Sequence, residues 1–252
     1  MKAIINPVSY CVLFVLLLFT PILRAGDKTE KKSELRRHSP KAASEDRIAT
    51  ALFSEEVCDL YTAIDLKSFG LSEKAFRYAY KGYKYLVNHH FLNRSDVISI
   101  CDFSQSSRNK RLYVLDMDQK KVIINTYVAH GRRSGSEYAR SFSNNPESHK
   151  SSLGFYITEQ SYYGDHGEAL KIHGLERGFN DKADRRNIVI HGSEYVGPDF
   201  LRSNKFNGRS FGCPAVPSSD IDQVIQTIKN GSCLFIYYPT KKYITKSKIL
   251  NG

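Results

Sequence analysis

The sequence has no tryptophan, so the large aromatic side chains of its core must come from 16 tyrosines and 14 phenylalanines. After the N-terminal segment it lacks any run of about 20 apolar residues, which excludes a polytopic membrane protein. It also lacks an internal repeat of structural length. With 41% hydrophobic and 25% charged residues among 252, the composition is that of a globular protein.

Negative charge is scarce. The chain has 37 Lys and Arg against 26 Asp and Glu, a formal net charge of +11. A basic surface favours anionic partners such as nucleic acid, lipid headgroups or a carboxylate-rich polymer. The basic residues form no clustered motif, and the N-terminus indicates export, so nucleic acid is disfavoured as a partner.

Several catalytic motifs are missing as well. We find no G-x-S-x-G elbow and no phosphate-binding loop. Five histidines are candidate metal ligands, but no two of them have the close spacing of an HxxxH or HxH zinc site. These histidines are His130, His149, His166, His173 and His191. No metal and no cofactor are therefore expected.

The N-terminus has the pattern of a targeting segment. Lys2 precedes the apolar run 11–19, and Ala25 ends the segment. Residues 1–25 are predicted to be a signal peptide, and residues 26–47 a flexible charged linker. The protein is then exported to the periplasm or cell envelope. A retained, uncleaved segment is the alternative, and it would associate the protein with the inner membrane.

The remaining chain changes character near residue 95. Residues 48–95 are predicted to be helical, because Val57, Leu60, Tyr61 and Ile64 recur at helical spacing. Residues 96–240 contain short β-prone runs separated by Gly, Ser and Asn, with one helix expected at 218–229. The expected fold class is mainly β (α+β), with the helical segment packed on a β-rich catalytic domain. Residues 241–252 are expected to be a basic tail, and the protein a monomer.

Cysteine context singles out one candidate nucleophile. Cys11 leaves with the signal segment, and the pairing of Cys58, Cys101 and Cys233 stays open. Cys213 lies in Gly-Arg-Ser-Phe-Gly-Cys-Pro at 208–214, where small residues let backbone amides approach and Arg209 favours a thiolate. A structural disulfide at Cys213 is the alternative.

A thiol nucleophile needs a base within hydrogen-bonding reach. His191 ends a predicted strand at Ile-His-Gly-Ser, 190–193, and is the preferred base. His173 has a similar local sequence, Ile-His-Gly, and is its competitor.

The two segments 190–193 and 210–213 together resemble the YkuD-like L,D-transpeptidases of bacterial cell walls, whose signature is an HG[ST] strand end followed by an SHGC loop. The wider run, with Ser-Ser-Leu-Gly-Phe at 151–155, is similar to the murein L,D-transpeptidase catalytic domain subgroup. The resemblance covers about 60–238. It implies a YkuD-like β-rich fold.

The resemblance also implies roles for residues. Cys213 attacks a murein stem tetrapeptide, His191 moves the proton, and the amides of Gly212 and Cys213 stabilise the oxyanion. Ser210 holds the loop, and a backbone carbonyl near Gly192 or Ser193, beside the substrate, orients the imidazole. The acceptor is a second stem amine. An L,D-carboxypeptidase using water, or a catalytically silent wall-binding module, is the alternative.

Two departures from the signature matter. Phe211 stands where the family has His, and Ala215 where it has Arg. We expect Arg209 to supply the missing cation and to clamp a substrate carboxylate, unless it only braces the loop. Tyr163 is expected to form part of a flap over the cleft, with a plain surface turn as the alternative.

Overall fold

The computed structural model describes residues 40–164 and 167–252, of which 44–252 form one compact unit. The predicted signal peptide and residues 26–39 of the predicted linker lie outside the described residues. Helix α1 (Pro40–Ala63) begins inside the stretch expected to be linker. The reason is local: Pro40 suits the first turn of a helix, and the alanines that follow favour helix strongly.

Helix α2 (Glu73–Asn88) follows the first helix as the spacing predicts. The Ser72 hydroxyl caps it by accepting a hydrogen bond from Ala75 N at 3.2 Å. Glu56 of α1 binds α2 twice, accepting from Lys84 Nζ and from the Tyr80 hydroxyl at 2.6 Å each. In the part of the chain that the structure describes, no helix is both long and apolar enough to span a membrane.

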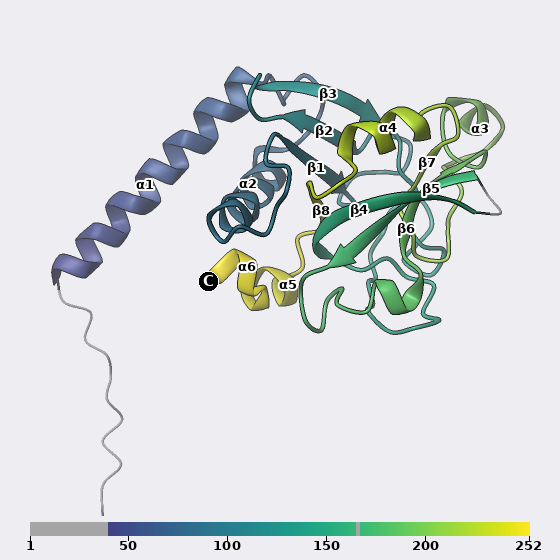
Figure 1. Ribbon diagram of the computed structural model, residues 1–252. Helices are drawn as coiled ribbons and strands as arrows, with labels where there is room; N and C mark the ends of the chain where they lie inside the picture. Colours follow the sequence, from purple (N-terminus) through teal and green to yellow (C-terminus); the bar gives the residue numbers. More distant parts are fainter. Residues whose placement is uncertain (1–39, 165–166) are drawn as a thin grey trace, which may run out of the picture. The chain divides into compact units, whose positions relative to one another are not determined.

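Eight strands form a single mixed sheet, so the mainly β expectation is confirmed (Figure 1). They are β1 (Val97–Asp102), β2 (Leu112–Asp116), β3 (Lys121–Thr126), β4 (Gly154–Gly164), β5 (Gly167–Gly174), β6 (Val189–Ser193), β7 (Ala215–Pro217) and β8 (Cys233–Tyr237). Their order is β3-β2-β1-β8-β4-β5-β6-β7. β8 lies at the centre, parallel to β1 and antiparallel to β4, and β7 lies at the edge, parallel to β6.

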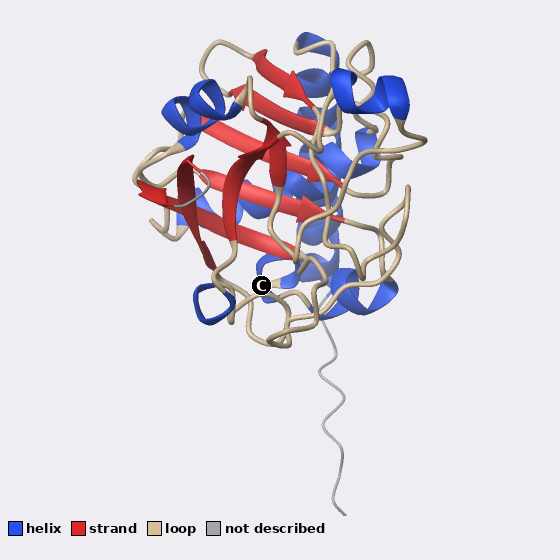
Figure 2. Ribbon diagram, turned by 90° about the vertical axis from the view of Figure 1, so that its right-hand side faces the viewer, coloured by secondary structure: helices blue, strands red, loops and turns tan. Residues whose placement is uncertain are grey.

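Helices cover both faces of this sheet (Figure 2). The rest are η1 (Asp184–Arg186), α3 (Pro198–Ser203), α4 (Ile221–Ile228), α5 (Lys241–Lys246) and α6 (Lys248–Asn251). Side chains that are an odd number of positions apart in a strand point to opposite faces of the sheet. Phe155 of β4 lies against Gly82 of α2, whereas Thr158 of the same strand donates to Ile228 O at the end of α4. α2 and α4 therefore pack on opposite faces.

The C-terminal segment is not a tail. Residues expected to be a basic extension form α5 and α6, with Tyr243 and Leu250 buried. The buried carboxylate of Glu176 holds them, accepting from the Tyr243 hydroxyl at 2.7 Å, from the Ser247 hydroxyl and from Phe155 N. Burial raises the pKa of Glu176, and these donors act against that rise. The many lysines concealed a pattern of buried apolar residues between them.

The contact between α2 and β4 predicts the effect of one methyl group. An added Cβ on Gly82 would lie 1.9 Å from Cζ of Phe155, whose ring is fully buried and stacked on Phe235. We expect Gly82→Ala to lower the free energy of unfolding by about 1–3 kcal/mol through overpacking, although alanine favours helix. Urea unfolding measures this. The neighbouring exposed Lys81→Ala should be near neutral, and equal stability of both variants would contradict the prediction.

Candidate active site

The pairing of β6 with β7 brings the two reactive side chains to one place. His191 lies opposite Ala215 in the parallel register. Cys213 precedes Ala215 by two residues, roughly 7 Å back along an extended chain. Its Sγ accepts from Val189 N at 3.5 Å, and the thiol donates to Asn187 O at 3.6 Å. The candidate nucleophile Cys213 therefore lies beside the start of the strand that carries His191.

A cavity of about 820 Å³ opens above this edge of the sheet. The predicted site residues that line it are His191, Gly192, Ser193, Arg209, Ser210 and Cys213. Gly212 is buried within the loop beside it. Tyr163 is not brought to the cavity: it lies near the end of β4, where its side chain is 83% exposed.

The imidazole of His191 is held by its own strand. Nδ1 lies 2.9 Å from Gly192 O. Since a carbonyl only accepts, Nδ1 carries the proton and Nε2 has the free lone pair. In the described part of the chain no hydrogen bond joins His191 to Cys213. Such contacts are often long without substrate and shorten when it binds.

Ser210 fixes the turn that ends at Cys213. Its hydroxyl donates to Cys213 O at 2.6 Å and accepts from Gly212 N at 3.0 Å. The Gly212 amide is therefore already used, so it does not point to an oxyanion as expected. The Cys213 amide binds no other residue within 40–164 and 167–252, which leaves it as the available donor.

Two glycines and a serine pack this turn against a second loop. An added Cβ on Gly131 would lie 3.0 Å from Gly212 Cα, and Gly212 has a φ of 135°. Ser151, fully buried, joins them: its hydroxyl accepts from Gly131 N at 3.0 Å and donates to Gly212 O at 3.2 Å. The Ser-Ser-Leu-Gly-Phe segment thus supports the nucleophile's loop, a role that the sequence alone did not indicate.

The L,D-transpeptidase catalytic domain family matches residues 67–237, well over half of the chain. The chain belongs to this family. No curated protein sequence matches it.

Solved structures of L,D-transpeptidases are similar only at a distance. The enzyme of Mycobacterium smegmatis is 10% identical, with a TM-score of 0.34, over 57% of this chain and 59% of that one. One from Mycobacterium tuberculosis H37Rv is 13% identical, with a TM-score of 0.33, over 57% and 58%. One from Xylanimonas cellulosilytica is 13% identical, with a TM-score of 0.32, over 67% and 81%. The chain thus spans less than two thirds of the mycobacterial proteins.

Within this L,D-transpeptidase domain, the two departures from the signature have visible consequences. Phe211 is 62% exposed at the cavity, with His149 at 4.6 Å between ring centroids and the Arg132 guanidinium 5.2 Å from its ring. Arg209 is exposed, and its Nη1 donates to Gly135 O at 3.2 Å. Arg209 therefore has a bracing contact and also lines the cavity.

Arg186 is a site residue that sequence analysis missed. It is half-buried, and its guanidinium binds one loop through four contacts. Nη1 donates to Ser143 O at 2.9 Å and to Ser152 Oγ at 2.8 Å, while Nη2 donates to Lys150 O at 2.6 Å and to Ser148 Oγ at 3.4 Å. Half of these acceptors are backbone carbonyls, which no residue pattern reveals.

The same guanidinium lies close to the loop that carries Cys213. An added Cβ on Gly212, next to Cys213, would lie 3.1 Å from Arg186 Nη2. Burial raises the pKa of the Cys213 thiol, while the Val189 N–H and the charge of Arg186 lower it. Arg186 does not line the cavity, so its charge acts on the thiol from behind the loop, whereas Arg209 is the cation that lines the cavity beside Cys213.

The competing histidines lie elsewhere. His173 Nδ1 pairs with Asp184 Oδ2 at 2.8 Å, and the residue does not line the cavity. His166 lies outside the described residues. His130 is fully buried, where Arg111 Nη2 donates to its Nδ1 at 2.8 Å. Cys58, Cys101, Cys213 and Cys233, the cysteines that the structure describes, are all free thiols.

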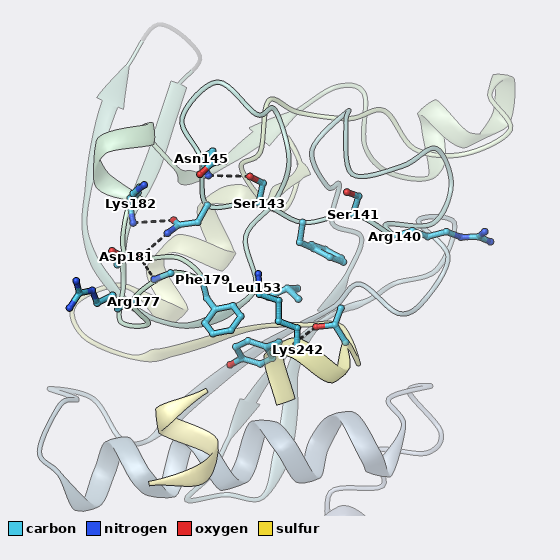
Figure 3. A pocket seen from close by; sticks show the side chains of 15 residues that line it. Arg140, Ser141, Ser143, Asn145, Leu153, Arg177, Phe179, Asp181, Lys182 and Lys242 are labelled. Carbon is cyan, nitrogen blue, oxygen red and sulfur yellow. Dashed lines mark hydrogen bonds between the residues drawn. The ribbon is translucent and has the colours of Figure 1, made fainter. Parts of the chain in front are cut away.

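Another cavity, of about 590 Å³, contains neither Cys213 nor His191 (Figure 3). Its apolar wall includes Phe179 and Tyr243. Figure 3 shows Arg140 and Arg177 at its rim, pointing to opposite sides and away from the cavity. These cations do not converge on a ligand, so we do not assign the site there.

Arg186 predicts the pH dependence of thiol reactivity. In a Cys58→Ser background, which removes an exposed thiol, Arg186→Ala should shift the pH profile of Cys213 alkylation by iodoacetamide to higher pH, because a cation that lowers the pKa is lost. Arg186→Lys should shift it less. The adjacent exposed Arg185→Ala is the control, and identical profiles in all variants would contradict the effect.

The buried His130 predicts a pH dependence of stability. Burial and the charge of Arg111 lower its pKa to about 3, whereas the unfolded chain takes up this proton near pH 6.5. The free energy of unfolding should therefore fall as the pH drops from about 6.5 towards 3, by at most about 1.4 kcal/mol per pH unit from this residue. His130→Gln should flatten that decline in urea unfolding. Exposed His90→Asn should not, and equal slopes would contradict the prediction.

Proposed function

We propose that this chain is a cysteine-dependent murein L,D-transpeptidase. One observation carries the proposal: Cys213 and His191 line the same cavity, and His191 Nδ1 is fixed on Gly192 O so that Nε2 is free to act as a base. Membership of the L,D-transpeptidase family supports the reaction class.

In the proposed reaction, Cys213 gives its proton to His191 Nε2, and the thiolate attacks the carbonyl carbon between an L-centre and D-Ala of a stem tetrapeptide. The Cys213 amide stabilises the oxyanion. The C–N bond then breaks, the leaving amine takes the proton from His191, and a thioester remains. An acceptor amine attacks the thioester, gives its proton to His191, and the expelled thiolate recovers it.

The chain's own charge suits this substrate. Murein stems carry carboxylates, and the net charge of +11 favours an anionic polymer. The apolar N-terminal run 11–19 supports export, so we place the reaction in the cell envelope.

The nucleophile gives the first test. Cys213→Ala should reduce product formation from purified murein tetrapeptide fragments by about a thousandfold or more, since Cys213 is the only thiol of the described residues that lines the cavity. The melting temperature should barely change, because a small half-buried side chain contributes little packing. Mass spectrometry follows the products, and exposed Cys58→Ala is the control.

The products separate the alternatives. Crosslinked dimers support the transpeptidase, whereas tripeptides without dimers identify an L,D-carboxypeptidase that uses water. Binding to murein without any conversion would identify a silent wall-binding module and overturn the proposal. His191→Gln should lose activity, whereas His173→Gln should retain it.

A further inference from the structure

Beside the cavity that holds Cys213 lies a second cavity, of about 700 Å³, which is distinct from the one in Figure 3. The two share Phe200 and Arg209 in their linings. Arg132 and Lys205 also line the second cavity. A molecule extending from the nucleophile past Arg209 would enter it.

The charge lining this second cavity is all of one sign. Arg132, Lys205 and Arg209 contribute three cations, and no carboxylate from residues 40–164 or 167–252 lines it. Among the salt bridges of the described residues, none involves these three side chains. Uncompensated cations gathered on one concave surface repel each other, so an anion that binds there is stabilised.

Aromatic rings hold two of the cations in place. The Arg132 guanidinium lies 5.2 Å from the Phe211 ring, and that of Arg209 lies 5.6 Å from the Phe206 ring. Arg132 is further fixed by its backbone, which donates to Ser210 O at 2.7 Å. A guanidinium stacked on a ring keeps its N–H edge free for a planar carboxylate. Phe211, the departure from the signature, lines the cavity of Cys213 and contacts a cation of the second cavity.

We propose that this second cavity binds a carboxylate of the peptide whose reacting carbonyl lies over Cys213, with Arg132 and Lys205 as its main ligands. The inference rests on the proposed function for its substrate, an acidic peptide. It adds a binding subsite outside the Cys213–His191 pair. Arg209, at the boundary, contacts both parts of the peptide.

Binding is measured apart from turnover, with the Cys213→Ala full chain and a fluorescein-labelled tetraglutamate peptide as the probe, by fluorescence anisotropy. We expect the double variant Arg132→Gln/Lys205→Gln to weaken binding about three- to tenfold, the range of exposed charge pairs. The matched control is Arg140→Gln/Arg177→Gln, which removes two charges at the other cavity (Figure 3) and should leave affinity within about twofold. A labelled tetraglutamine should bind weakly to every variant.

If both double variants bind tetraglutamate equally weakly, net charge alone attracts the peptide and the subsite is overturned. If neither variant binds it more weakly than the parent protein, the subsite is overturned as well. In the active protein, Arg132→Gln/Lys205→Gln should raise KM for murein fragments and leave kcat nearly unchanged. A loss confined to kcat would also overturn it. If the binding pattern holds but the wild-type protein forms neither dimers nor tripeptides, the proposed reaction fails while the anion subsite stands.

Discussion

The parallel pairing of β6 with β7 is the constraint on which the site depends. It sets His191 opposite Ala215 and so brings the Cys213 thiol to Val189 and Asn187. A slip of one residue would turn every side chain of the strand to the other face. Three residues of β7 cannot hold that register alone. Ala129 N also donates to Ala215 O at 2.7 Å, and the hydroxyl of Ser151 binds Gly131 and Gly212 just before the strand.

Opposing effects act on the pKa of the Cys213 thiol. Burial raises the pKa of Cys213, and the thiol donates to Asn187 O. Arg186 opposes this effect without forming a direct ion pair. In the proposed reaction, Nε2 of His191 is the group that accepts the thiol proton. Because reactivity toward oxidants follows thiolate character, such a thiol is also less exposed to oxidation.

Much of this structure follows from local sequence, and the rest does not. The apolar spacing of 75–87 predicts α2, that of 221–228 predicts α4, and the β-prone runs predict most strands. β7 was not predicted, because three residues beside prolines carry no period. α5 and α6 are not predicted either, because the many lysines of 241–248 leave too few apolar residues to show a helical spacing. Arg186 could not be found, since its partners lie more than 30 positions away and are partly backbone. The pair of Cys213 and His191 was predictable because their motifs are short and contiguous.

The position of β8 has a consequence for how the chain is made. This strand separates β1 from β4 at the centre of the sheet, yet it spans residues 233–237. A ribosome therefore releases two half-sheets, β1–β3 and β4–β7, before the strand that joins them emerges. Each half presents an unpaired strand edge during that interval, and the joining contacts are distant in sequence. The native sheet can close only once residues 233–237 have emerged to pair with both β1 and β4, so the two halves must stay competent to join until then.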